Sequence, residues 1–152
     1  MTAKWRKLRQ LTRGERRQLA RAWWRLPLLA VAVKLCGFRR CQKWLAARAK
    51  PVARPTGDPL SYARQTARLV RLAGRYSPVP ARCLPQSLLL WHWLQRAGLD
   101  SVICLGARQE AGRLYAHAWV EYAGEPLAEA AAVRRSSVPF TAAGVKPAER
   151  PR

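Results

Sequence analysis

The chain has 152 residues, enough for one compact domain and too few for two. Apolar residues make up 49% of it and charged residues 24%, a balance that excludes wholesale disorder and fibrous repeats. The net charge of +21, from 29 Lys and Arg against 8 Asp and Glu, indicates an anionic partner or surface.

The positive charge is concentrated near the N-terminus. Residues 1–50 hold 15 Lys and Arg and one acidic residue, Glu15, for a net charge of +14. Residues 76–152 hold 9 Lys and Arg and 6 acidic residues, for a net charge of +3. An anionic partner is therefore expected to contact the N-terminal part of the chain.

Cysteine usage and hydropathy restrict the compartment. Four cysteines are too few for a disulfide scaffold in a chain of this size, and none forms a C-x-x-C pair. The longest apolar run, Leu26–Val33, has 8 residues against the ~20 that cross a bilayer, and its flanks do not fit a secretory signal. We expect a cytoplasmic protein, and the basic N-terminal part allows association with a membrane surface.

Residues 14–50 are predicted to form basic helices. Apolar residues recur there at helical spacing, with arginines displayed around them. Pro27 is expected to kink or divide this run, and Gly37 to break it. The proline-rich stretch Pro51–Pro59 is typical of a connector, so residues 1–57 are predicted to be a basic helical N-terminal part.

A further helix is predicted after this connector. Asp58 is the expected N-cap, Pro59 takes the first helical position, and Gly74 is the expected end. The predicted inner face of the helix holds Tyr62, Thr66, Leu69, Val70 and Ala73.

The rest of the core is predicted to be a central helix followed by antiparallel strands. The helix covers residues 84–97 and ends at Gly98. The elements expected after it are a strand at 102–105, a turn at 109–112, an alternating strand at 114–122 and a turn at 123–124. Residues 58–135 thus form the predicted core, and residues 136–152 a C-terminal tail that is partly loose.

Cys83 stands where a proline-rich connector becomes the central helix. Backbone N–H groups and the positive end of the helix dipole stabilise a thiolate at such a position, which makes Cys83 a candidate nucleophile. Taken alone, however, a cysteine near a helix start is more often a small buried apolar residue.

The remaining cysteines and His92 carry weaker signals. Cys104 lies in an apolar strand, which predicts an inert buried thiol, and His92 is expected to be a packed or surface imidazole. Cys36 and Cys41 have no histidine nearby that would complete a zinc site. We expect no metal and no cofactor, since Walker, G-x-G-x-x-G and G-x-S-x-G motifs do not occur in the sequence.

His117 lies in the alternating strand, on the same face as Trp119 and Glu121. Such a histidine can take the proton from a thiol brought near it, and an acidic group would orient its ring. Glu121 is too far away for this role, about 13 Å along the strand.

Glu129 is the acidic residue that a hairpin would bring to His117. If residues 122–124 form a three-residue loop, Glu129 pairs directly opposite His117. The same register sets Glu121 against Glu125, an unfavourable pair, so a shifted register stays open.

These segments together resemble a known family. RCLPQSLLLWHWLQRAG, VICLGAR and AHAWVEYAGEPLAE follow one another as in the microcin-processing, transglutaminase-like leader peptidases, the B proteins of lasso-peptide biosynthesis. The resemblance covers residues 60–130 most strongly, and RLPLLAVAVKLCGFRR resembles the same family more loosely. It implies a catalytic triad of Cys83, His117 and Glu129. The family usually has Asp at the last position, so Glu129 is one methylene longer.

The resemblance also implies a fold and an activity. The fold is α+β in the papain/transglutaminase style, with Cys83 at the start of the central helix and with His117 and Glu129 on an antiparallel sheet. The activity is that of a cysteine peptidase, which removes the leader from a lasso precursor peptide before a separate ATP-dependent macrolactam cyclase closes the ring. The helical N-terminal part does not resemble the small β-rich leader-binding module, so a separate leader-recognition protein is the expected partner.

A non-catalytic binding module is the alternative interpretation. The charge of +14 over residues 1–50, with Trp5, Trp23, Trp24 and Trp44 interleaved, suits nucleic-acid phosphates or an anionic membrane surface. Nucleic acid is the less favoured partner because the sequence carries no recognised docking motif for it. Iodoacetamide should inactivate a thiol-dependent peptidase, whereas a phosphate binder should respond mainly to salt.

Overall fold

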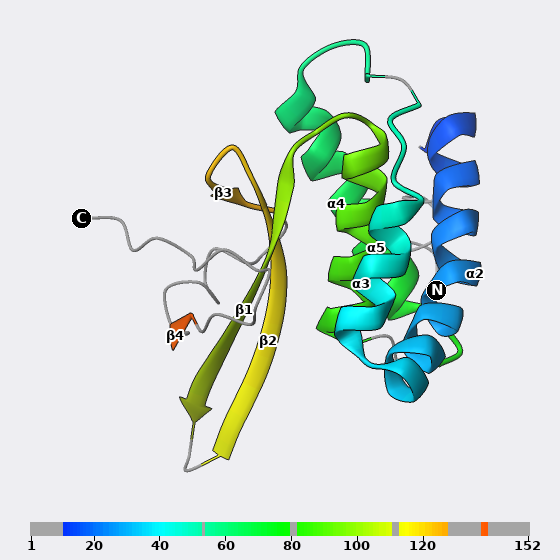
Figure 1. Ribbon diagram of the computed structural model, residues 1–152. Helices are drawn as coiled ribbons and strands as arrows, with labels where there is room; N and C mark the ends of the chain where they lie inside the picture. Colours follow the sequence, from blue (N-terminus) through cyan, green and yellow to red (C-terminus); the bar gives the residue numbers. More distant parts are fainter. Residues whose placement is uncertain (1–10, 53, 80–81, 111–112, 128–137, 140–152) are drawn as a thin grey trace.

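The computed structural model describes residues 11–52, 54–79, 82–110, 113–127 and 138–139. The described helices lie on one side of an antiparallel sheet with the strand order β3-β2-β1-β4 (Figure 1). The fold is therefore α+β, as predicted. The helices are α2 Arg13–Cys36, α3 Phe38–Ala47, α4 Pro59–Arg75 and α5 Cys83–Arg96, and the strands are β1 Ser101–Glu110, β2 Arg113–Tyr122, β3 Glu125–Pro126 and β4 Val138–Pro139.

A capping box starts α2. Thr12 Oγ1 accepts a hydrogen bond from the Glu15 backbone N–H at 3.2 Å, and Glu15 Oε2 accepts one from the Thr12 backbone N–H at 2.7 Å. Both bonds satisfy N–H groups that a helix start would otherwise leave unpaired. The hydrogen bond from the Thr12 backbone is also the main cause that lowers the pKa of Glu15.

Of the two outcomes expected at Pro27, a kink or a division, the division does not occur, because α2 continues through it as a single helix. Proline removes the N–H that would bond to the Trp23 carbonyl. Residues on both sides of it are buried in the core, Leu26 among them, and this packing keeps the turn helical. The helix ends before Gly37, as predicted, and this glycine has a positive φ of 81°. Within the described residues, no helix is long and apolar enough to cross a membrane.

The start of α4 agrees with the prediction and its end does not. Asp58 caps the helix by accepting a hydrogen bond from the Ser61 backbone N–H at 2.8 Å. Gly74 lies inside the last turn, and the helix continues to Arg75. A Cβ at position 74 would come within 2.7 Å of the Gln86 Cδ atom, so this glycine leaves room for the Gln86 side chain of α5. The predicted inner face is buried at Thr66, Leu69, Val70 and Ala73 and partly buried at Tyr62.

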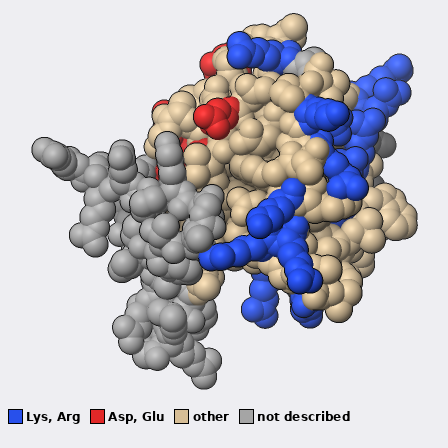
Figure 2. Space-filling view, in the orientation of Figure 1, with Lys and Arg blue, Asp and Glu red and all other residues tan. Residues whose placement is uncertain are grey.

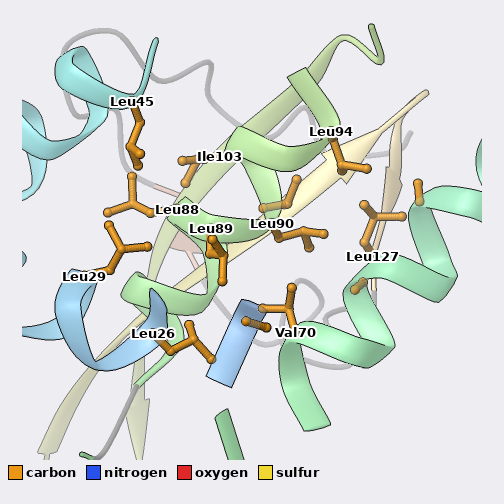
Figure 3. Packing of buried hydrophobic residues seen from close by; sticks show 14 of the residues in the cluster. Leu26, Leu29, Leu45, Val70, Leu88, Leu89, Leu90, Leu94, Ile103 and Leu127 are labelled. Carbon is orange, nitrogen blue, oxygen red and sulfur yellow. The ribbon is translucent and has the colours of Figure 1, made fainter. Parts of the chain in front are cut away.

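The central position predicted for the helix of residues 84–97 is confirmed. α5 contacts α2, α3 and α4 on one side and β1 and β2 on the other. Leucines from α5 point into a shared cluster with side chains from the other helices and the sheet (Figure 3). Labelled members of this cluster are Leu26, Leu29, Leu45, Val70, Leu88, Leu89, Leu90, Leu94, Ile103 and Leu127.

The two faces of the sheet pack differently. Ile103 of β1 pairs with Val120 of β2, and both are buried in the cluster that the helices share. Cys104 and Trp119, the next pair, form a separate buried cluster. Because side chains alternate along a strand, the first pair faces the helices and the second lies on the outer face. β1 and β2 stay paired as far as Glu110 and Arg113. The turn predicted at 109–112 therefore includes two residues, Gln109 and Glu110, that belong to β1.

The three-residue loop does not form, and the register between β2 and β3 is shifted by one residue, which is the alternative that the Glu121–Glu125 pair left open. Tyr122 pairs with Glu125, and the turn consists of Ala123 and Gly124, with φ values of 52° and 78°. Two successive positive φ values are typical of the two-residue turns that match strand twist. In this register Glu121 faces Pro126, so the two carboxylates are not directly opposite each other.

Candidate active site

Cys83 is the first residue of α5. Arg82 precedes it in extended conformation and makes no side-chain cap, in contrast to Thr12 at α2 and Asp58 at α4. The Arg82 side chain therefore leaves the backbone N–H groups at the start of α5 uncapped, within the part of the chain that the structure describes. Together with the helix dipole they can stabilise negative charge at the Cys83 sulfur or on an oxygen beside it.

Exposure and position distinguish Cys83 from the other cysteines. Cys83 is partly exposed, whereas Cys41 and Cys104 are buried. Burial raises the pKa of Cys41 and thereby disfavours its thiolate. Cys36 is exposed, but it is the last residue of α2, where the negative end of the helix dipole opposes a thiolate. Of the four, Cys83 alone combines access with the positive end of a helix.

Cys83 along α5 and the His117 backbone along the sheet lie at similar distances from the point where β1 begins. The Ser101 carbonyl accepts hydrogen bonds from Trp91 Nε1 at 3.1 Å and from Gln95 Nε2 at 3.0 Å, so β1 begins beside the last turns of α5. Cys83 is ~12–18 Å back along the helix from those two residues. β1 runs back beside α5, and the position paired with His117 is ~17 Å along it (Figure 1).

The His117 side chain stands on the outer face of the sheet. It shares this face with Trp119, and the two rings stack with their centroids 6.3 Å apart. Trp119 Nε1 in turn donates a hydrogen bond to Glu121 Oε1 at 2.9 Å. The structure does not bring the Cys83 and His117 side chains together, because Cys83 begins α5, which packs on the inner face of the sheet, and His117 stands on the outer face.

Glu129 lies outside the described residues. The register that would set it opposite His117 depends on a three-residue loop, and the observed two-residue turn removes that argument. The assignment of Glu129 to the site therefore depends on the family resemblance alone.

His92 is a packed histidine, which is one of the two environments expected for it. It is buried, and its Nδ1 atom donates a hydrogen bond to the Leu45 carbonyl at 3.1 Å. Burial is the main cause that lowers the pKa of His92, so the neutral ring is favoured. His92 thus joins α5 to α3.

Two features of the site are absent from the sequence-based prediction. One is the row in which Trp119 contacts both His117 and Glu121, although their alternation in the strand was a visible signal. The other is the uncapped start of α5, which the arginine at position 82 indicates because its side chain cannot accept a hydrogen bond. Within the described residues, there is no group of His, Cys, Asp and Glu side chains that could hold a metal ion.

The sequence of the chain matches a known protein family. Residues 25–141 match the Transglutaminase-like superfamily, and the match takes in α3, α4, α5 and the described strands. The chain belongs to this superfamily. A transglutaminase-like domain has a cysteine-protease-type fold, as the resemblance implied. No curated protein and no solved structure matches the chain.

Proposed function

We propose that this transglutaminase-like protein is a cysteine peptidase that removes the leader from a ribosomally made lasso precursor peptide. The observation that carries the proposal is the position of Cys83, partly exposed at the uncapped start of the central helix of a cysteine-protease-type fold. The substrate class comes from the resemblance of the Cys83 and His117 segments to lasso-peptide leader peptidases.

In the proposed reaction, the Cys83 sulfur attacks the carbonyl carbon of the scissile peptide bond, and His117 takes the thiol proton. His117 then gives this proton to the leaving amine, so the peptide bond breaks and a thioester to Cys83 remains. Water, with His117 accepting its proton, attacks the thioester carbonyl, the C–S bond breaks to give the leader's carboxyl group, and His117 returns the proton to the Cys83 sulfur. The Cys83 backbone N–H is the first donor to the developing oxyanion.

The reaction requires the His117 imidazole to reach the Cys83 sulfur when substrate is bound. Because α5 packs on the inner face of the sheet and the imidazole stands on the outer face, substrate binding has to bring the two side chains together. Within the described residues, β3 pairs with Glu121 and Tyr122, and Leu127 adds a hydrogen bond to the Val120 carbonyl. Catalytic hydrogen bonds that are long in a free enzyme often shorten in the substrate complex.

Glu129 is proposed to orient the His117 ring, and further proteins complete the pathway. A separate leader-recognition protein presents the precursor. An ATP-dependent macrolactam cyclase then joins the amine that the peptidase frees to a side-chain carboxylate. The proposed enzyme itself needs no metal and no cofactor for the cleavage.

Mass spectrometry of a lasso precursor incubated with this protein and a leader-recognition protein tests the proposal. The wild-type chain should release the leader, and Cys83→Ala should not, because no other group replaces the sulfur nucleophile. Cys104→Ala is the matched control and should retain most of the activity, since Cys104 is buried in the outer-face cluster.

Two results would contradict the proposal: cleavage that survives in Cys83→Ala, or a wild-type protein that leaves the precursor intact in the presence of its leader-recognition protein. Iodoacetamide separates the peptidase from a phosphate-binding module. It should abolish leader release, whereas a binding module should respond mainly to salt.

A further inference from the structure

α2 carries apolar side chains on two opposite faces. The inner face is in the core, where Ala22, Leu26, Leu29 and Ala30 are buried. The outer face has a line of exposed apolar side chains at spacings of three and four residues, which places them along one side of the helix. They are Trp24, Leu28, Val31 and Leu35, with exposed fractions of 69%, 67%, 48% and 79%.

The same line is basic toward the start of the helix. Arg13, Arg17 and Arg21 are exposed and precede Trp24 at the same spacings. We call the line from Arg13 to Leu35 the outer row. It is cationic in its first half and apolar in its second half, and exposed basic residues follow its apolar end at the start of α3, namely Arg39, Arg40 and Lys43.

The outer row faces away from the sheet. In Figure 1, α2 is at the side of the helical layer farthest from β1 and β2. Figure 2 shows Lys and Arg side chains among uncharged ones on this side of the molecule. Exposed apolar residues that occur singly are ordinary, but a continuous row of large ones indicates a binding surface.

The chemistry of the outer row favours a lipid surface over other occupants. Nucleic-acid phosphates would pair with the arginines and leave Leu28 and Leu35 in water. A second copy would bring two basic surfaces together in a chain of net charge +21. An anionic bilayer satisfies both halves, because its phosphates attract the basic groups while its acyl boundary takes up the apolar side chains.

We propose that the outer row of α2 binds the surface of an anionic phospholipid bilayer. The helix lies parallel to the membrane plane, with the apolar half, ~16 Å long between Trp24 and Leu35, inserted at the headgroup boundary. A tryptophan at this depth is typical of interfacial segments. The sheet, with His117, then faces away from the membrane, where a precursor peptide has access to it.

Vesicle flotation with the full chain tests the proposal. The wild-type protein should float with vesicles of phosphatidylglycerol and phosphatidylcholine and stay behind with phosphatidylcholine alone. The double variant Leu28→Ser with Leu35→Ser should bind anionic vesicles roughly 10-fold more weakly, because two apolar side chains no longer insert. Val52→Ser is the matched control, since Val52 is 70% exposed outside the helices, and it should bind like the wild type.

A second pair of variants tests the basic half. Arg17→Gln with Arg21→Gln should weaken binding to anionic vesicles and reduce its dependence on salt. Arg68→Gln with Arg75→Gln removes the same charge from exposed positions of α4 and should have the smaller effect. All four positions are exposed, so these variants should keep the wild-type fold in circular dichroism.

Equal binding of wild-type protein and the Leu28→Ser, Leu35→Ser variant would overturn the proposal. Equal binding to vesicles with and without phosphatidylglycerol would overturn it as well. A wild-type protein that fails to float but forms a dimer, lost in the double variant, would assign the row to a second copy instead. Leader release from a soluble precursor should be unchanged in the double variant, so this test is independent of the proposed peptidase.

Discussion

The α2–α3 unit and the α5–β2 unit share one hydrophobic core but differ in charge. Residues 1–50 carry a net charge of +14, whereas residues 76–152 carry +3. On their inner sides, Leu26 of α2 and Leu45 of α3 meet Leu88 of α5 in the same buried cluster (Figure 3). The difference lies on the outer surface, which suggests that the basic unit recruits partners while the nearly balanced unit holds the candidate catalytic residues.

One polar contact joins the two units, and a second joins α2 to the end of α4. His92 of α5 donates to the Leu45 carbonyl of α3. Trp23 Nε1 of α2 donates to the Tyr76 carbonyl at 2.8 Å, next to the end of α4. These contacts indicate that the basic helices are part of the folded domain, so effects on stability and effects on catalysis have to be measured separately.

The largest effect is expected from the α5–β2 unit. His117→Ala should lower kcat/KM for leader release roughly a thousandfold or more, as Cys83→Ala should, and the double variant should be no worse than either, because groups that act as one unit are strongly non-additive. Glu129→Gln should be milder. Single losses that multiply in the double variant would show that Cys83 and His117 act independently.

Several parts of this unit are predictable from local signals. A Pro-rich connector before an apolar run indicates the helix that Cys83 begins, and alternation of residues indicates the face of His117. Asp58 followed by proline likewise indicates the start of α4. In each case the cause is a short-range preference of the backbone, which can be predicted from the sequence without knowledge of the tertiary structure.

Tertiary packing explains what the sequence alone could not indicate. Pro27 stays inside a helix because buried neighbours hold it, and Gly74 leaves room for the Gln86 side chain of α5 and does not end α4. The hairpin register depends on Ala123 in the left-handed region, a conformation that alanine rarely takes. The predicted position of Glu129 depended on that register, which is why the third member of the triad is the part least accessible to sequence reasoning.

Core substitutions should test whether the two units unfold together. Leu26→Ala in α2 and Leu89→Ala in α5 should each lower the free energy of unfolding by about 2–5 kcal/mol, because both side chains are fully buried. Urea unfolding followed by far-ultraviolet circular dichroism and by tryptophan fluorescence measures this. Val52→Ala, at an exposed position, is the control. Two separate transitions in Leu26→Ala would show that the units do not share one cooperative core.

The contact between α3 and α5 should make stability depend on pH. Burial lowers the pKa of His92 from its ordinary value of 6.5, so the unfolded chain binds more protons than the folded one just below this pH. The free energy of unfolding should therefore fall as the pH drops through 6.5 and level off below the folded-state pKa.

His92→Phe separates the titration from the hydrogen bond. It should cost about 0.5–1.5 kcal/mol at neutral pH, because the hydrogen bond from His92 is lost while the Leu45 carbonyl keeps the Arg48 N–H, and it should flatten this part of the pH profile. Urea unfolding of both proteins across this pH range is the measurement. A profile in His92→Phe as steep as in the wild type would assign the titration to another group.

The smallest effect is expected from the surface of the basic unit. Arg17→Gln with Arg21→Gln should raise the KM for the precursor complex a few-fold with little change in kcat, because exposed charges act on encounter and binding. Added salt should have a similar effect on the wild type. A fall in kcat at constant KM would show instead that the basic helices support the active-site geometry.

Alkylation by iodoacetamide tests most directly whether His117 activates the Cys83 thiol. Peptide mass mapping gives the rate at each cysteine. Cys83 should react about 10-fold or more faster than exposed Cys36, because Cys83 begins a helix and, in the proposed mechanism, passes its thiol proton to His117. His117→Ala should slow Cys83 to the rate of Cys36. A Cys83 that reacts no faster than Cys36, or at a rate independent of His117, would contradict the account.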